Sequence, residues 1–409
     1  MNSARETAAN AEAFRRLVES RPVLTGMARA GEVIPGMKPN TVLHSGPEIE
    51  FSAMRGAHRQ GIVGALLFEG IARDETEAVG MIEAGEIEIR AANDFNSGAP
   101  GSGITSSSMA VLVVEEKTSG IRAFAPPIEG VQGGGLGGWG VCNPAIRENL
   151  RSIAGVIAPL FSRVLASCGG IDVKALFAEG VTMGDEEHTR QVATDALFFA
   201  KMAAASASAG LTAEERCTLL DYLGSCRRFV HHIGCATAVA ALKSAAHVEH
   251  STMVTAMGGN GVEFGIKLSG RGEQWFTAPS PTFTGRYFSP EYSDRDSSPW
   301  LGDSSNVEAF GLGGMAAGAA PILIRSRGGD VATGAAQTAE MAKICLGENP
   351  QFIIPMLDGR RVPCGIDARK VLETGILPMM HGGILSREGG QIGVGYARTP
   401  LECFRRALN

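Results

Sequence analysis

The densest cluster of ionisable side chains in the sequence lies between residues 185 and 190. It contains Asp185, Glu186, His188 and Arg190. A histidine near carboxylates can transfer protons at neutral pH, and an arginine can hold an anion or stabilise a developing oxyanion. The segment is therefore a candidate catalytic site. A structural explanation stays open, because acidic residues are favoured in the first turn of a helix whatever the function.

A capping-box pattern predicts that this cluster begins a helix. Thr182 and Asp185 are three residues apart, which is the spacing of an N-cap and its partner. On such a helix Asp185 and His188 share one face, and Glu186 and Arg190 share another. We therefore expect the four side chains to act in two pairs.

A glycine-rich turn, with Gly311, Gly313 and Gly314, is a second candidate site. It follows an apolar run and precedes a stretch of small residues. Free backbone N–H groups at the start of a helix bind anions such as phosphate or carboxylate. Close packing of small residues explains the glycines equally well. Polar residues just upstream, Asp303, Ser304 and Glu308, add hydrogen-bonding groups, although ordinary turn chemistry also favours Asp and Ser.

Three further patterns carry less information. Residues 133–138 satisfy G-x-G-x-x-G, but no strand or helix is predicted directly beside them, so we expect a substrate-covering loop and not a dinucleotide site. His231 and His232 are adjacent and cannot face the same way on a helix, so we interpret them as structural. His247 and His250 share a face but have no evident third ligand. No metal site is predicted.

Composition excludes several classes of protein. The 409 residues include 54 glycines, 44% are hydrophobic and the net charge is −6, with no basic block. We expect a folded protein of two or three domains that binds neither nucleic acid nor membrane surfaces. No signal peptide is predicted, and apolar stretches such as 156–165 are too short to cross a bilayer. Eight scattered cysteines favour a cytoplasmic protein with reduced thiols.

The elements that must hold these residues are predicted to form an α+β fold. Two mixed α/β regions, 1–140 and 258–409, flank a mainly helical subdomain at 141–257. Asn143 and Gly169 have the properties of a helix start and a helix end. The runs 109–114 and 121–124 alternate around a Gly-containing turn and predict a hairpin.

The motifs of the chain resemble one known family closely. Gly180–Arg190, GVTMGDEEHTR, is similar to a G-[VI]-T-M-G-D-E-x-H-x-R stretch of the YlbE-like family, long described as a domain of unknown function. Further matching blocks are VTAM at 254–257, WFTAP at 275–279, GDS at 302–304 and GID at 365–367. The resemblance runs from about Leu43 to the C-terminus.

The resemblance implies an activity and a partner. Family members are associated with oxamate carbamoyltransferase of allantoin breakdown, which converts oxalurate and phosphate to oxamate and carbamoyl phosphate. It implies a cytoplasmic oligomer with an FdrA-like subunit, related to acyl-CoA synthetases, and no cofactor besides the phosphate substrate. Asp185, Glu186, His188 and Arg190 are then the expected catalytic residues. Expected substrate or anion contacts are Asn93, Asp94, Asn260, Trp275, Asp303, Ser304, Glu308, Gly311, Gly313 and Gly314.

One departure from the family pattern concerns residues 93–97. Relatives carry consecutive histidines ahead of a Val-Gly-Pro-Met turn, where this chain has Asn-Asp-Phe-Asn-Ser. The difference implies either another substrate or a loss of activity. Two alternatives therefore stay open. One is an independent amide- or ureide-hydrolysing enzyme, metal-dependent or not, that uses His188 with Asp185 or Asp94; the other is a non-catalytic structural subunit of an FdrA-like complex.

Overall fold

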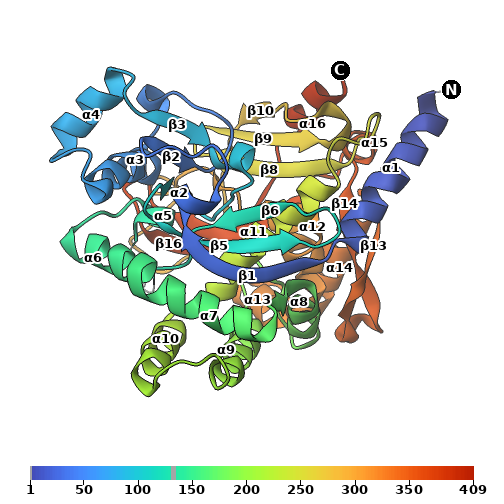
Figure 1. The fold of residues 1–409 in the computed structure, drawn as a ribbon. Coiled ribbons are helices and arrows are strands. Elements are labelled where there is room, and N and C mark those ends of the chain that lie inside the picture. Colours follow the sequence, from blue (N-terminus) through green and yellow to red (C-terminus); the bar gives the residue numbers. More distant parts are fainter. Residues whose placement is uncertain (1, 130–134) are drawn as a thin grey trace.

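The structure, a computed structural model, describes residues 2–129 and 135–409 (Figure 1). Its helices are interleaved with several small sheets, which confirms the predicted α+β fold. Most paired strands are antiparallel, and only β2 (Thr41–His44) and β3 (Glu88–Ala91) pair in parallel. Gly133 and Gly134 of the predicted glycine loop lie outside the described residues, and its end forms a short helix, α5 (Leu136–Trp139).

The first sheet has the strand order β6-β5-β1-β7. Its strands are β1 (Pro22–Arg29), β5 (Ala110–Glu116), β6 (Arg122–Ala125) and β7 (Ile171–Asp172). The hairpin of β5 and β6 is confirmed. The sequence did not predict β1, whose pairing with β5 shifts register between Leu24 and Gly26. A break of this kind interrupts the alternation by which strands are recognised.

The second sheet has the order β10-β9-β8-β12. Its strands are β8 (Val254–Asn260), β9 (Glu263–Leu268), β10 (Phe276–Pro279) and β12 (Leu301–Gly302). Helix α11 (Phe229–Ser244) contacts both this sheet and the first one, and every residue from Phe229 to Leu242 is buried (Figure 1). A helix that is apolar on nearly all sides is stable only in such an enclosed position.

Smaller sheets surround this centre. Strand β2 lies between β3 and β4 (Thr105–Ser106). Strand β16 (Gln391–Arg398) lies between β11 (Thr284–Tyr287) and β15 (Met379–Leu385). Strands β13 (Cys345–Ile354) and β14 (Arg360–Ile366) form a two-stranded ribbon.

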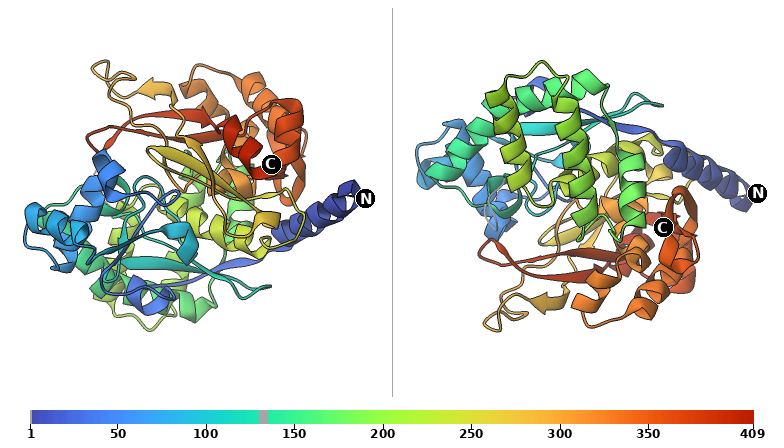
Figure 2. Two further views of the ribbon diagram at one scale, coloured as in Figure 1. Left: turned by 90° about the horizontal axis from the view of Figure 1, so that it is seen from above. Right: turned by 90° about the horizontal axis from the view of Figure 1, so that it is seen from below.

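A long helical segment covers the first sheet. It begins at the Asn143 cap as α6 (Pro144–Ser152), continues through a π-helical turn, η3 (Ile153–Ile157), and ends as α7 (Ala158–Cys168) at Gly169, as predicted. Helix α7 packs on β1, with α9 (Val192–Ser206) and α10 (Ala213–Ser225) beside it (Figures 1 and 2).

The same segment is the one stretch of the described chain that is long and apolar enough to cross a membrane. This span, Pro144–Cys168, has a mean hydropathy of 1.3 over its most apolar window, and 50% of that window is buried within the fold. The apolar run 156–165, which the sequence predicted to be too short to cross a bilayer, is part of this longer helical span. Because core helices pass the same test, and because α7 packs against β1 and α9, we interpret it as a packing element.

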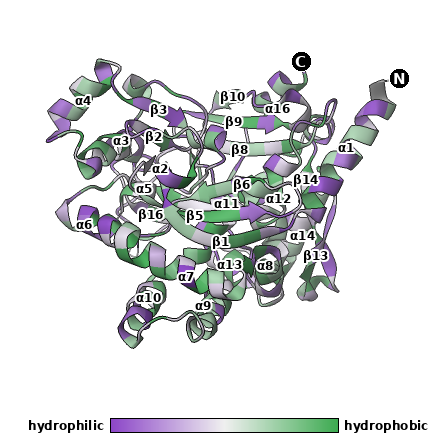
Figure 3. Cartoon of the chain, viewed as in Figure 1, coloured by the Kyte–Doolittle hydropathy of each residue, from purple (hydrophilic) through white to green (hydrophobic). Residues whose placement is uncertain are grey.

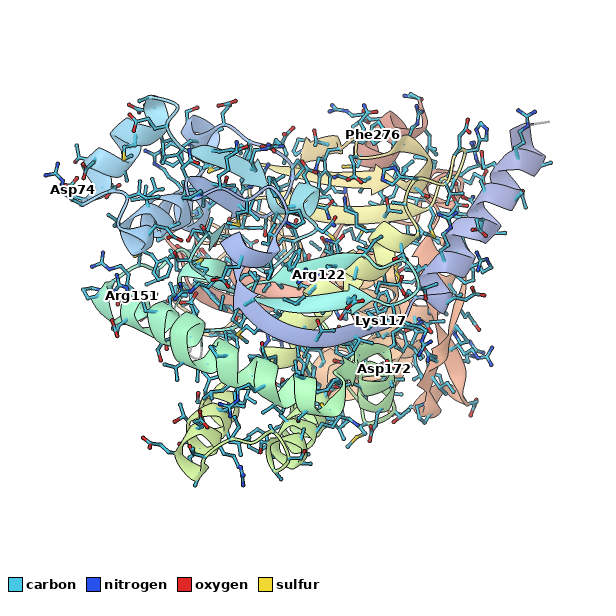
Figure 4. The ribbon with its side chains drawn as sticks, viewed as in Figure 1. Asp74, Lys117, Arg122, Arg151, Asp172 and Phe276 are labelled. Atoms are coloured by element: carbon cyan, nitrogen blue, oxygen red, sulfur yellow. The ribbon has the colours of Figure 1, made fainter. Side chains whose placement is uncertain are left out.

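The remaining helices connect and cover these sheets. They are α1 (Asn2–Glu19), α2 (Ala30–Val33), α3 (Gly56–Glu69), α4 (Glu75–Glu83), α8 (Val173–Thr182), α12 (Asn306–Phe310), α13 (Pro321–Ser326), α14 (Val331–Ala342), α15 (Ala368–Thr374) and α16 (Leu401–Leu408). Short 3₁₀ turns are η1 (Phe51–Ala53), η2 (Ala92–Phe95), η4 (Ser269–Arg271), η5 (Gly313–Ala319) and η6 (Pro355–Leu357). Asp74 and Asp172 cap α4 and α8 through their side chains (Figure 4).

The prediction of a helix at 185–190 is wrong. Helix α8 ends at Thr182, α9 begins at Val192, and residues 183–191 form a loop. We call this segment the 183–191 loop. Its carboxylates are buried and accept backbone N–H groups of the loop itself: Glu186 Oε1 accepts from Thr189 and Arg190. These hydrogen bonds take the place of helical ones, which the capping-box pattern cannot reveal.

The largest hydrophobic core joins the ends of the chain. It includes residues as far apart as Ala13, Phe161, Phe264 and Ala407, and so draws on all three predicted ranges. Figure 3 shows β1 and β5 as hydrophobic over most of their length, whereas α4 carries many hydrophilic residues. The candidate site described below is built at the centre of this shared core.

Candidate functional site

A small cavity lies between the N-terminus of α11, the 183–191 loop and the second half of β15. Its volume is about 50 Å³, which is room for a few water molecules or a small ligand. The polar lining comes from His188, Arg228, His231, His232, Ser304 and Gln391. Trp300 and Phe283, stacked with ring centroids 5.1 Å apart, form an aromatic wall.

His188 is held in this cavity by a carboxylate. Its Nδ1 lies 2.7 and 2.9 Å from the two oxygens of Glu308, and both side chains are buried. An ionised carboxylate only accepts hydrogen bonds, so Nδ1 carries the proton and donates it. Nε2 is then free to take or give a proton at the cavity. Such a carboxylate–histidine pair is suited to general acid–base chemistry.

The glycine turn holds Glu308. The Gly314 N–H donates to Glu308 Oε1 over 3.2 Å, and the His381 N–H donates to the same atom over 2.9 Å. The Gly313 N–H donates to the carbonyl of Glu186 over 2.6 Å, and Gly311 ends α12 with a φ of 102°. The anion at the predicted cradle is therefore a side chain of the protein, and these N–H groups point away from the cavity's ligand space.

A second carboxylate–histidine pair lies behind the first. Glu186 Oε2 lies 3.0 Å from His381 Nδ1, and both groups are fully enclosed. Burial opposes ionisation of Glu186, but the hydrogen bond from His381 and the charges of the neighbouring histidines and Arg327 together outweigh it and lower the pKa of Glu186 to about 2. Burial, followed by the nearby Arg327, lowers the pKa of His381. The pair therefore consists of a carboxylate and a neutral imidazole.

The N-terminus of α11 supplies the cationic and imidazole side of the cavity. Arg228 adopts a left-handed backbone, with a φ of 67°, and the carboxylate of Asp195 accepts its N–H over 2.6 Å and that of Val230 over 3.1 Å. This arrangement turns the guanidinium of Arg228 toward the cavity that it lines. The positive end of the α11 dipole adds to its charge.

His231 and His232 both line the cavity, although the sequence indicated a structural role. Their rings are 6.0 Å apart and nearly perpendicular, so each reaches a different wall. His231 stacks on His188 with centroids 5.0 Å apart, and His232 Nδ1 lies 2.7 Å from the carbonyl of Pro126. Burial lowers the pKa of His231, and it lowers the pKa of His232 to about 4, so both are neutral at physiological pH.

The other half of the predicted catalytic cluster lies elsewhere. Arg190 forms an ion pair with Asp185 and donates to the carbonyl of Gly184 over 2.9 Å. The second oxygen of Asp185 accepts the N–H of Thr194 over 2.9 Å and so caps α9. Arg190 lines two outer grooves and does not line the central cavity, whereas Glu186 and His188 turn inward.

Four of the ten predicted substrate contacts gather at a seam between the N-terminal region and the second sheet. Asp94 pairs with Lys267 over 2.6 Å, and the Lys267 ammonium lies 4.8 Å from the ring centroid of Trp275. Asn260 accepts two backbone N–H groups of its own turn. Asn93 is buried, and its Oδ1 has no hydrogen-bond partner among the described residues.

Asp303 and Ser304 link this seam to the cavity. Asp303 accepts the N–H of Gly46 over 2.8 Å and is completely buried, and burial raises its pKa to about 7. Ser304, the next residue, lines the cavity. Among the described residues, no group of three or more His, Cys, Asp or Glu side chains is arranged to hold a metal ion.

We did not predict from the sequence that the cavity is also lined by Arg228, Trp300 and the glycines of β15. Arg228 could have been found from its position directly before a helix that is apolar on nearly all sides but carries two histidines in its first turn. Trp300 and Gly382 meet only through the tertiary fold, where a Cβ on Gly382 would lie 3.0 Å from the indole.

The fold and the cavity define an α+β protein with a small cavity lined by histidines, an arginine and aromatic side chains. A family model described as "Oxamate carbamoyltransferase subunit AllG" matches residues 87–304. Oxamate carbamoyltransferase subunit AllG of Escherichia coli K12 is 37% identical over 405 residues, covering 98% of this chain and 96% of that protein. The chain therefore belongs to the AllG family, which agrees with the YlbE-like resemblance of its motifs.

Two further comparisons agree with this assignment. The uncharacterized protein YahG of Escherichia coli K12 is 34% identical over 403 residues, covering 98% of this chain and 85% of YahG. A crystal structure of a conserved protein of unknown function from Enterococcus faecalis V583 superposes with a TM-score of 0.96 at 34% identity, covering 100% of this chain and 98% of that one.

Proposed function

We propose that the protein is a subunit of a carbamoyltransferase that converts oxalurate or a closely related ureide, with phosphate, to carbamoyl phosphate and an oxamate-like amide. The observation that supports this most directly is the enclosed cavity in which His188, Arg228, His231 and His232 meet. The family assignment supports a role as a subunit of an oxamate carbamoyltransferase complex. We propose an FdrA-like partner and a cytoplasmic location, as the resemblance of the motifs implies.

The chemistry of the cavity suits this reaction. A phosphate oxygen attacks the terminal carbamoyl carbon, and the bond from that carbon to the amide nitrogen breaks. The attacking hydrogen phosphate loses a proton and the leaving nitrogen needs one. His188 Nε2 can take the proton from the phosphate, forming an imidazolium that Glu308 stabilises, and then deliver it to the leaving nitrogen. Arg228 and the N-terminus of α11 place positive charge where the substrate carboxylate or the oxyanion would lie. No covalent nucleophile is required when both substrates are held in line.

The proposal assigns new roles within the predicted cluster. His188 remains the proposed proton donor, with Glu308 as its orienting carboxylate. Arg228 takes the anion-binding role expected of Arg190, because Arg228 lines the cavity and Arg190 does not. Glu186 and Asp185 are proposed to position the 183–191 loop.

The test is phosphorolysis of oxalurate by the chain reconstituted with an FdrA-like subunit. We expect carbamoyl phosphate to form with the wild type, and Arg228→Lys to raise KM for the anionic substrates because a lysine cannot reproduce the planar guanidinium. Release of ammonia and carbon dioxide without carbamoyl phosphate would instead identify a hydrolase. Unchanged KM and kcat in Arg228→Lys would contradict the assignment of the cavity.

A further inference from the structure

Two grooves on the outer surface share Arg190. The first, of about 770 Å³, lies between α9 and α10 and is lined by Val192, Phe199 and Arg227 among others. The second, of about 270 Å³, lies between the end of α8 and α13 and is lined by Met183 and Ile322 among others. We call the two together the Arg190 surface. Figure 1 shows α8, α9 and α13 on the same side of the molecule.

Exposed apolar side chains are concentrated on this surface. Val192 is 65% exposed and Ile322 is 66% exposed, and Met183, Phe199 and Met356 are also exposed. These five line the two grooves, whereas the other large exposed apolar side chains of the described residues lie outside them. A contiguous apolar patch with a polar rim is typical of a protein-binding surface.

The charge of the Arg190 surface is opposite to that of the whole chain. Its charged lining consists of Arg190, Arg227 and Arg228, with Asp195 as the acidic residue. The Asp195 carboxylate is already engaged by two backbone N–H groups of the turn into α11. The carboxylates of Asp185 and Asp195 offset two of the three arginines, and one net positive charge remains, with Arg227 exposed. On a chain of net charge −6 this positive charge favours an acidic partner.

The surface is also connected to the catalytic candidates. Arg190 pairs with Asp185, which lies in the same loop as Glu186 and His188. Arg228 lines both the larger groove and the central cavity. A partner that covers Arg190 would therefore fix the 183–191 loop and one wall of the cavity together.

We propose that the Arg190 surface is the docking site for a different subunit, which contributes a segment that combines carboxylates with apolar side chains. The inference rests on the proposed function, since that function requires a second subunit. It goes further by placing the contact on α8, α9 and α13 and by making the partner's acidic segment the neighbour of the loop that carries His188.

The experiment measures binding of the full-length chain to a purified FdrA-like subunit by calorimetry and analytical ultracentrifugation. Val192→Asp and Ile322→Asp change the surface, and both sites lie in a first helical turn, where an aspartate is compatible with the helix. Val262→Asp is the matched control, because Val262 is 41% exposed in the turn between β8 and β9, outside both grooves. We expect each of the two surface variants to weaken binding at least tenfold and the control to bind like the wild type.

Each alternative outcome contradicts a different statement. If all three variants bind as tightly as the wild type, the docking surface is wrong and the proposed function stands. If the wild type does not bind the FdrA-like subunit at all, both the partner and the docking site are wrong. If the wild type is itself a dimer that Val192→Asp dissociates, the surface joins identical chains and the proposal of a different subunit is overturned. Weaker binding at higher salt concentration is expected only for the charged contact proposed here.

Discussion

At the scale of single residues, the candidate site depends on which groups hold His188. Glu308 accepts from His188, from the His381 N–H and from the Gly314 N–H, so one buried carboxylate fixes the imidazole and is itself fixed by two backbone groups. This arrangement sets the tautomer of His188 before any substrate arrives. A preorganised group does not need to reorient in the reaction, which is the main advantage of a buried catalytic pair.

Glu308→Gln is expected to reduce kcat by about 10²- to 10⁴-fold, because the amide keeps the shape of the carboxylate but cannot stabilise a protonated His188. The measurement is steady-state phosphorolysis by the reconstituted enzyme. His247→Ala, at a side chain that is 62% exposed and paired with Glu273, should leave the rate unchanged. Full kcat in Glu308→Gln would remove His188 and Glu308 from the proposed chemistry.

The raised pKa of Asp303 should make the free energy of unfolding depend on pH. Burial raises its pKa from an ordinary value of 3.8 to about 7 in the folded state. Between these values the folded protein binds more protons than the unfolded chain, so the free energy of unfolding falls as the pH rises from about 4 to about 7. Asn cannot ionise, so the stability of Asp303→Asn relative to the wild type should increase over the same range and then level off. Thermal unfolding at a series of pH values checks this, and parallel curves for the two proteins would contradict it.

The candidate residues could be predicted from the sequence only in part. Glu186 and His188 do meet other ionisable groups, but their partners, His381 and Glu308, are 195 and 120 residues away along the chain. No local spacing encodes such pairs. Arg190 was expected to share a helical face with Glu186, and the 183–191 loop separates their side chains by turning Glu186 inward and Arg190 outward.

At the scale of elements, the sequence predicted those helix ends that depend on hydrogen bonds between neighbouring residues. The predicted helix start at Asn143 is confirmed because its side chain caps the backbone three residues on, and Asp74 and Asp172 cap their helices in the same way. Strand β1 was missed because its position in the sheet depends on pairing with β5, about 90 residues later, across an irregular register. The capping box at Thr182 failed because buried hydrogen bonds of Glu186 and Asp185 stabilise a loop there.

Two glycine-to-alanine substitutions test how tightly the elements pack around their glycines. A Cβ on Gly314 would lie 2.1 Å from the carbonyl oxygen of Met379, at the point where η5 meets β15. Gly314→Ala should therefore destabilise the protein by about 1–3 kcal/mol and disturb Glu308. Gly80, inside α4, has no atom within 4 Å of its Cβ position, so Gly80→Ala should stabilise the protein by about 0.5–1 kcal/mol. Chemical denaturation of both variants checks the two signs, and equal effects would contradict the packing argument.

At the scale of the whole molecule, all three predicted parts of the chain contribute residues to one hydrophobic core. Helix α11 belongs to the predicted helical range 141–257, yet it packs on β5 and β6 from the first range. The division into 1–140, 141–257 and 258–409 stays a prediction. It followed from composition, which distinguishes helical from mixed segments but does not show against what each segment packs.

A fragment of residues 141–257 is expected not to fold independently, because α11 would expose the side chains that it now buries against both large sheets. Circular dichroism of the fragment should show no cooperative thermal transition, while the full chain should unfold in one transition by calorimetry. A fragment with a sharp transition of its own would support an autonomous helical subdomain.

The enclosure of α11 has a consequence for how such proteins diversify. His231 and His232 sit on a helix with no exposed residue from Phe229 to Leu242, so any exchange there alters the centre of the molecule as well as the ligand. The opposite wall includes Gly101 of a connecting loop, Gly138 of the short helix α5 and Gly383 of β15. New ligand preferences are therefore expected to arise by changes in those segments, while the imidazole side is inherited unchanged. An engineer who wishes to change the substrate should begin on the wall opposite α11.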